Sequence, residues 1–103
     1  MVSICVMPHY IILWSWSEKG VENVKNSPTR ADQFKKTLEN KGGRLVSIYW
    51  TFGQYDGVAI VETPDDATLM SAILSIESGG NARTVTLKAF TYQEAAKIIG
   101  NLS

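Results

Sequence analysis

The chain has 103 residues, of which 45% are hydrophobic and 19% are charged, and these values are typical of one globular domain. Ten Lys and Arg residues balance ten Asp and Glu residues. The chain therefore lacks the excess of positive charge that is typical of a nucleic-acid-binding protein. A single cysteine, Cys5, excludes an intramolecular disulfide and favours a cytoplasmic protein. Together with the single histidine, His9, it provides no set of metal ligands, and we expect neither a metal nor a cofactor.

The N-terminal part of the chain contains an expected extension and the first predicted strand. Residues 1–6 are expected to be an N-terminal extension, and residues 7–103 a single domain. The segment "HYIILWSW", residues 9–16, is rich in β-branched and aromatic residues and predicts a strand, with His9 solvated at an edge of the sheet. Residues 17–26 are expected to form a loop. No apolar run approaches the roughly 20 residues of a membrane span, so no membrane contact is expected.

The segment "SPTRADQFKKTLENKGG" predicts a helix with clear ends. Ser27 is expected to be the N-cap and Pro28 the first helical residue. Apolar residues then recur at helical spacing, and Gly42 and Gly43 are suited to a left-handed stop.

The second half of the chain predicts three strands and two helices. Residues 44–52 and 57–63 are expected to form a hairpin, and residues 82–90 the last strand. Asp65 is expected to cap a helix that ends near Ser78, and Thr91 to cap a short C-terminal helix. The order predicts an α+β, ferredoxin-like βαββαβ fold with a four-stranded antiparallel sheet and an added C-terminal helix.

Two helices cover only one face of such a sheet. We expect the covered face to contain Ile11, Leu13, Val46, Ile48, Trp50, Val58, Ile60, Val85, Leu87 and Ala89. We expect the opposite face to contain Tyr10, Ile12, Trp14, Trp16, Leu45, Tyr49, Thr51, Ala59, Val61, Thr84, Thr86, Lys88 and Phe90. An uncovered face rich in aromatic side chains predicts a homodimer in which two sheets pack face to face.

Two interpretations of that aromatic face stay open. The aromatic residues are all interface core, or they surround a pocket for a small apolar or aromatic ligand, because such pockets combine apolar walls with a few polar groups. The candidate ligand-binding residues are Trp14, Tyr49, Thr51, Tyr55, Asp56, Arg83 and Thr86.

Several motifs link the chain to a known family. The stretches "MPHYIILWSWSEKGVENVKNSPTR", "YWTFGQYDGVAIVETPDD" and "GNARTVTLKAFT" include the G-x-Y-D element at Gly53, Tyr55 and Asp56. With these motifs the chain resembles the GYD domain family of small, largely uncharacterised microbial proteins, from residue 7 to about residue 99. The resemblance implies a ferredoxin-like fold of the dimeric α/β-barrel type and supplies no established reaction.

The "GQYDG" turn has a structural and a functional interpretation. Gly53 permits a positive φ, Asp56 can accept hydrogen bonds from the amides of the turn, and Tyr55 can lie over the end of the sheet. Alternatively, Tyr55 and Asp56 lie at the mouth of the pocket, with Arg83 as a counter-charge.

Two functions follow from these features. The first is a homodimeric module that binds a small molecule or a partner protein between the sheet face and the "GQYDG" turn. The alternative is a small cofactor-independent enzyme, of the monooxygenase or isomerase type, in which Tyr10, Tyr49 or Asp56 supplies the acid–base group. Nucleic-acid binding is not expected, because residues 57–63 have neither basic nor aromatic side chains.

Overall fold

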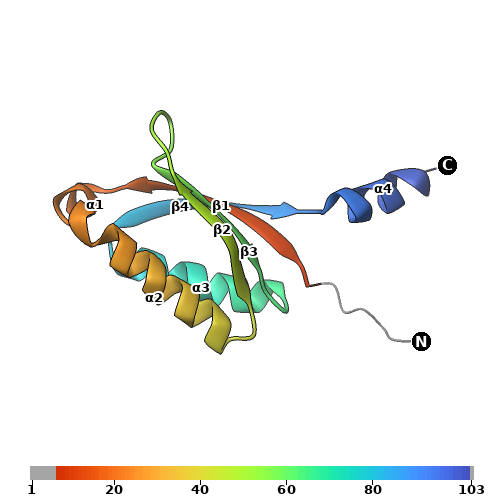
Figure 1. The fold of residues 1–103 in the computed structure, drawn as a ribbon, viewed down its shortest axis with the longest axis horizontal. Helices are drawn as coiled ribbons and strands as arrows, with labels where there is room; N and C mark the ends of the chain where they lie inside the picture. The colour runs from red at the N-terminus through yellow and green to blue at the C-terminus, as the bar shows by residue number, and fades with distance from the viewer. Residues whose placement is uncertain (1–6, 103) are drawn as a thin grey trace.

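The structure, a computed structural model, describes residues 7–102 as a four-stranded antiparallel sheet with two long helices on one face (Figure 1). The strands are β1 (His9–Trp16), β2 (Arg44–Trp50), β3 (Gly57–Glu62) and β4 (Ala82–Ala89), in the spatial order β2-β3-β1-β4. The helices are α1 (Glu18–Glu22), α2 (Ser27–Asn40), α3 (Asp66–Ser78) and α4 (Tyr92–Gly100), with a 3-10 helix at Val24–Asn26. The predicted ferredoxin-like fold is confirmed, and the expected extension, residues 1–6, lies outside the described residues.

The short helix α1 was predicted as a loop, and that prediction was wrong. Ser17 caps α1, because its hydroxyl accepts a hydrogen bond from the Gly20 backbone N–H at 3.1 Å. A glycine inside a short segment disfavours a helix, which explains the wrong prediction. Gly20 is required by packing, because a Cβ at this position would lie 1.9 Å from the backbone oxygen of Asn81. The glycine therefore lets α1 approach the start of β4.

The three other helix starts show where capping rules work. Asp65 accepts a hydrogen bond from the Thr68 N–H at 2.8 Å, and Thr91 forms a capping box with Glu94, so both predicted caps are confirmed. Ser27, however, is the first residue of α2, and Asn26 occupies the N-cap position. The Ser27 hydroxyl instead accepts a hydrogen bond from Trp50, because it is buried against the sheet.

The assignment of side chains to the two faces was inverted in β1, β3 and β4. The buried apolar core contains Tyr10, Ile12, Leu38, Ala59, Val61, Leu69 and Ala72. The aromatic set of β1 therefore faces the helices, and Ile11 and Leu13 lie on the uncovered side. Both alternating sets of β1 are apolar, so periodicity alone does not identify the buried set. The larger side chains of β1 lie under the helices, where they pack against residues of α2 and α3.

In β2 a bulge breaks the alternation on which the prediction relied. The register with β3 shifts between Leu45 and Ser47, so Leu45 and Ile48 both lie against the helix-side core. The placement of Ile48 and Trp50 under the helices was correct, whereas the placement of Leu45 on the opposite face was wrong.

Helix α4 lies beyond the end of the sheet and away from α2 and α3 (Figure 1). Its apolar residues Ile98 and Ile99 are 51% and 64% exposed. The capping box starts α4 directly after β4, and the direction of that strand takes the helix past the sheet. Part of the apolar stripe of α4 therefore has no cover in the single chain.

Candidate functional site

The sheet surface opposite α2 and α3 is apolar across all its strands. Cross-strand neighbours form two adjacent apolar rows, of which one runs between the two edge strands and the other runs from β4 to β3 and meets the polar Ser47 on β2. These residues, named the open face from here on, are Ile11, Leu13, Tyr49, Val58, Ile60, Val85 and Leu87. Val85, Leu87 and Tyr49 are 45%, 48% and 61% exposed. Large contiguous apolar patches on a free protein mark interaction surfaces, so the open face is a candidate interface.

At one end, the open face is bordered by an ionic cluster. Glu62 Oε1 lies 3.0 Å from His9 Nε2 and 3.2 Å from Arg44 Nη2. The hydrogen bond from Arg44 lowers the pKa of Glu62 below its ordinary 4.5, against the opposing effect of burial. The expectation that His9 lies at a sheet edge was wrong, because β1 pairs with strands on both sides. At the other end, Arg83 pairs in register with Ser15.

The Glu62 cluster predicts a defined pH dependence of stability. Because the folded-state pKa of Glu62 is depressed, its ion pairs stabilise the fold above pH 4.5 and are lost as the pH falls through the folded-state value. We expect Glu62→Gln to lower the free energy of unfolding at neutral pH, with the difference from wild type disappearing in acid. Urea denaturation at a series of pH values measures this difference. The exposed Glu39→Gln on α2 is the control, and a Glu62 effect that persists at low pH would contradict the assignment.

Tyr10 belongs to a second polar cluster, on the helix side of the sheet. Its hydroxyl donates a hydrogen bond to Asp66 Oδ1, and Lys88 Nζ lies 3.2 Å from the same oxygen. Burial, together with the hydrogen bond to Asp66, raises the pKa of Tyr10 above its ordinary 10.0. The Tyr10 hydrogen bond and Lys88 lower the pKa of Asp66. The raised pKa of Tyr10 lies further from the neutral range in which an acid–base catalyst works best.

Hydrogen bonds fix the base of the loop between β2 and β3. The Thr51 N–H donates to the Asp56 backbone oxygen at 2.9 Å, and the Thr51 hydroxyl donates to the Tyr55 backbone oxygen at 2.6 Å. Asp56 was expected to accept hydrogen bonds from the turn itself, but its Oδ2 accepts from the Trp16 N–H of β1 at 2.9 Å. The Asp56 carboxylate thus adds a hydrogen bond between the loop and the end of β1. The expected positive φ of Gly53 is confirmed at 119°.

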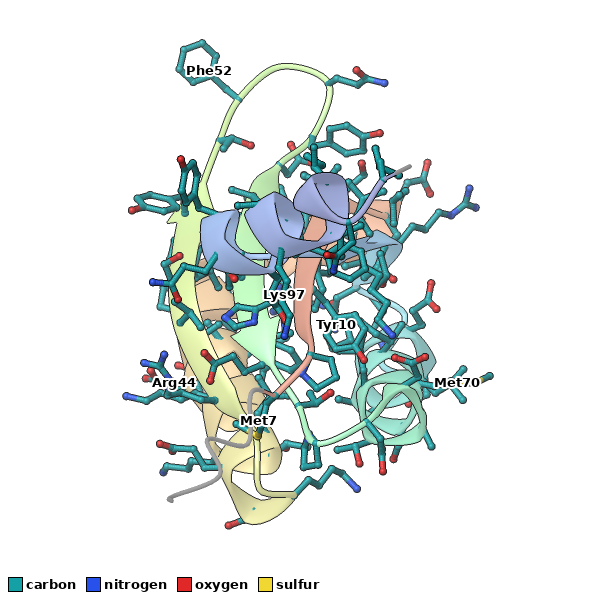
Figure 2. The ribbon with its side chains drawn as sticks, turned by 90° about the vertical axis from the view of Figure 1, so that its right-hand side faces the viewer. Met7, Tyr10, Arg44, Phe52, Met70 and Lys97 are labelled. Atoms are coloured by element: carbon teal, nitrogen blue, oxygen red, sulfur yellow. The ribbon has the colours of Figure 1, made fainter. Side chains whose placement is uncertain are left out.

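Phe52 lies at the tip of this loop and is fully exposed, at 101% of its reference surface. The loop leaves the sheet on the side away from α2 and α3 (Figure 1), and Figure 2 shows the Phe52 ring pointing away from the rest of the chain. The sequence interpretation did not select Phe52 as a candidate site residue, although an aromatic residue beside Gly53 in a predicted turn was the available signal. The structure therefore presents an aromatic side chain on a loop with a fixed base.

A cavity of about 410 Å³ lies between the sheet and the helices α2 and α3. Its floor includes Ile12, Trp14, Trp16, Trp50 and Ala59, and the α2 side contributes Arg30 and Phe34. All three tryptophans of the chain line this cavity. Several mouth residues, such as Gln33 and Ser75, are exposed and polar. The volume and the mixed lining are typical of a small-ligand pocket.

Packing holds the indole rings of the cavity in place. Trp50 Nε1 donates to Ser27 Oγ at 2.9 Å, and the Trp14 and Trp50 rings meet edge to face with centroids 6.1 Å apart and planes at 86°. Trp14 lies over Gly57, where an added Cβ would be 1.9 Å from the indole ring. The last glycine of "GQYDG" is therefore explained by packing, because it makes room for Trp14.

The comparison with known proteins identifies the family. The sequence model of the GYD domain family matches residues 10–99 of the chain. The chain belongs to the GYD domain family. A Thermus thermophilus protein named "Glutamine synthetase and cystathionine beta-lyase binding protein" is 37% identical to this GYD protein over 84 residues, which are 81% of this chain and 88% of that protein.

Solved structures support the same fold. The protein TTHA0845 from Thermus thermophilus superposes on this GYD protein with a TM-score of 0.53 and 23% identity, over 82% of this chain and 95% of that chain. MtbAldR superposes with a TM-score of 0.60 and 11% identity, over 88% of this chain and 60% of that chain. At these identities the likeness concerns the fold alone. Among residues 7–102, no helix is long and apolar enough to span a membrane, and no cluster of three metal-ligating side chains occurs.

The candidate residues predicted for this GYD protein separate into three groups. Trp14 lines the cavity, and Thr86, paired with Ile12, lies on the same side of the sheet but outside the lining. Tyr49 and Arg83 are on the uncovered side, on opposite edge strands. Thr51, Tyr55 and Asp56 come together in the loop between β2 and β3. Within residues 7–102, no ion pair joins Arg83 to Asp56.

The structure also adds cavity residues that the sequence interpretation did not select, namely Trp16, Ser27, Arg30, Phe34 and Trp50. The Trp14–Trp16 alternation was a signal for one of them. The pairing of α2 residues with β2 residues had no local signal, because the two elements meet only in the folded chain.

Proposed function

We propose that this GYD protein is a homodimeric binding module that docks onto a metabolic enzyme. The open face is the single observation that carries the homodimer, because an apolar surface that spans the sheet is unfavourable in water. The Thermus relative, whose name says that it binds glutamine synthetase and cystathionine beta-lyase, supports an enzyme of one of these kinds as the partner. A single cysteine fits the cytoplasm as the place of this association.

A second copy of the chain is the occupant that we propose for the open face. Domains of about 100 residues bury a modest fraction of their surface, and the largest fully buried side chains here are Ile12, Leu38, Val61 and Thr63. Two open faces related by a two-fold axis are self-complementary, since each presents aliphatic rows to the other at the roughly 10 Å spacing of packed sheets. The resulting assembly is a dimeric α/β barrel.

Helix α4 supports the same arrangement. Ile98 and Ile99 are exposed although they lie on an amphipathic helix, and the helix extends past the sheet of its own chain (Figure 1). An apolar stripe that its own domain leaves uncovered is suited to packing against a second copy. The exposed surfaces of the sheet and of α4 thus have one common explanation.

The structure offers less support for catalysis. The Tyr10 hydroxyl is hydrogen-bonded to Asp66, and its pKa is raised. The Asp56 side chain accepts a hydrogen bond from the Trp16 N–H. Tyr49 lies on the open face, which the dimer covers. None of these three acid–base candidates lines the cavity, so we favour binding over the enzymatic alternative.

The partner enzyme is proposed to contact the tip of the β2–β3 loop. Exposed aromatic residues on preorganised loops are suited to fill a pocket of a partner, and Phe52 lies on a loop whose base is fixed by Thr51 and Asp56. We expect Phe52→Ala to weaken binding of the partner enzyme by at least about 30-fold, which is the effect of a hot-spot residue. The measurement is calorimetric titration with glutamine synthetase and, separately, cystathionine beta-lyase from the same organism.

Met70→Ala is the matched control, because Met70 is an exposed apolar residue on the helix layer (Figure 2). We expect Met70→Ala to bind like wild type and Phe52→Ala to remain a dimer. If neither enzyme binds the wild-type protein, the proposed partner class is wrong. If Phe52→Ala binds normally, the loop is not the contact. If Phe52→Ala becomes a monomer, the loop belongs to the interface between copies.

A further inference from the structure

We propose that the cavity beneath α2 and α3 binds a small planar aromatic ligand that carries a carboxylate group. The cavity lies on the helix side of the sheet, opposite the open face. The proposal is therefore independent of the homodimer and of the enzyme partner. It also differs in place from the pocket expected between the sheet face and the "GQYDG" turn.

The walls favour a flat, apolar ring. Trp14, Trp50 and Phe34 surround the interior, and Ile12 and Ala59 close its floor with exposures of 2% and 3%. The indole N–H of Trp50 is satisfied by Ser27, so that ring is held in place without a ligand. Fixed aromatic rings bind another aromatic ring by edge-to-face or offset contacts with little loss of side-chain freedom.

Arg30 determines the expected charge of the ligand. It is the one charged residue in the lining, and no carboxylate lines the cavity among the described residues. Its Nη1 donates to the backbone oxygen of Asn23 at 2.9 Å, which restricts the position of the guanidinium. A guanidinium has five N–H donors in a planar fork, so donors remain to bind a carboxylate in a bidentate manner. Arg30 is half-buried, and partial removal from water strengthens such a contact.

The size and the position of the polar groups limit the ligand further. A cavity of about 410 Å³ falls near the lower end of the range for small-molecule sites, which suits one or two fused rings. The exposed polar residues Gln33 and Ser75 mark the mouth, and the buried residues Ile12 and Ala72 mark the interior. The ring therefore enters toward the sheet, and the carboxylate stays near α2 and the mouth.

The test uses 2-naphthoate as the probe, with the uncharged 2-naphthamide as its matched analogue. Because all three tryptophans line the cavity, intrinsic fluorescence reports binding there. We expect 2-naphthoate to quench the wild-type emission saturably and to bind at least about tenfold more tightly than 2-naphthamide, as for a charged hydrogen bond. Arg30→Gln is expected to remove this preference, so that both probes bind it with equal, weak affinity.

Lys35→Gln makes the same charge change at an exposed position of α2 outside the lining and is expected to bind both probes like wild type. The NMR signal of the Trp50 indole N–H, which is bonded to Ser27, should shift on addition of 2-naphthoate to the wild-type protein. Absence of saturable quenching, equal affinity of the two probes for wild type, or shifts confined to Ile11 and Leu13 would overturn the proposal. The comparison of 2-naphthoate with 2-naphthamide on the wild-type protein tests the proposal even if Arg30→Gln does not fold.

Discussion

Leu87→Glu is expected to convert the protein from a dimer into a monomer. Leu87 lies in one cross-strand row with Ile11 and Ile60, and it is 48% exposed in the single chain. In the proposed dimer a glutamate at this position would bury a carboxylate without a partner, and the two-fold axis would introduce it twice. We expect the dimer dissociation constant to rise by at least about 100-fold, since an unpaired buried charge costs several kcal/mol. Size-exclusion chromatography with light scattering gives the mass at micromolar concentration.

The matched control for this change is Leu74→Glu on α3. Leu74 is 53% exposed, close to the value for Leu87, but it lies on the outer surface of the helix layer. We expect Leu74→Glu to keep the mass of a dimer and the wild-type affinity. A Leu87→Glu protein that remains dimeric would show that the open face is not the interface. Equal dissociation by both variants would show that any added charge has the same effect.

Gly57→Ala is expected to lower the stability of the fold. Gly57 lies directly opposite Trp14 in the β1–β3 pairing, and an added Cβ would be 1.9 Å from the Trp14 ring. The ring must then move toward the cavity and lose its edge-to-face contact with Trp50. Overpacking of this kind costs about 1–3 kcal/mol. We expect a fall of that size in the free energy of unfolding, measured by urea denaturation, together with a changed tryptophan emission spectrum.

Gly100→Ala is the control for this substitution. It makes the same chemical change at the end of α4, where no atom lies within 4 Å of the added Cβ. We expect its free energy of unfolding to equal or slightly exceed that of wild type, because alanine is a better helix former than glycine. A Gly57→Ala protein as stable as wild type, with an unchanged emission spectrum, would contradict the close approach of Trp14 to Gly57.

Local chemistry predicted the elements of the fold well. Asp65 and Thr91 were identified as caps from the residue types alone, and the strand at His9–Trp16 begins and ends as predicted. These features depend on neighbours within a few residues, so the sequence contains the information needed to find them. Ser27 is the exception, because its hydrogen bond to Trp50 joins residues that are distant in the chain.

The sequence did not show in the same way which face of the sheet the helices cover. In β1 the set of Tyr10 and Ile12 and the set of Ile11 and Leu13 are both apolar. In β2 the bulge between Leu45 and Ser47 changes which residues share a face, and the sequence does not show this change. The choice depends on how much volume the helices leave to fill, which is a property of the packed layers. The open face exists in both assignments, but apart from Tyr49 its members are aliphatic rather than aromatic.

The candidate sites show the same division between local and distant information. Thr51, Tyr55 and Asp56 lie together in the loop because they are neighbours in sequence, and their expected role in ligand binding stays a prediction. The cavity was not predicted, since Arg30 of α2 and Trp14 of β1 meet only after the helix layer packs on the sheet. The loop could therefore be predicted from residues that are close in sequence, whereas the pocket forms only through tertiary packing.

The central claim is that a second copy covers the open face, and sedimentation equilibrium of the wild-type protein tests it most directly. The dimer predicts a single species at micromolar concentration with twice the 11.4 kDa mass of the chain. A species of 11.4 kDa throughout that range would contradict the claim. It would leave the aliphatic rows of the sheet and the stripe of α4 exposed to water.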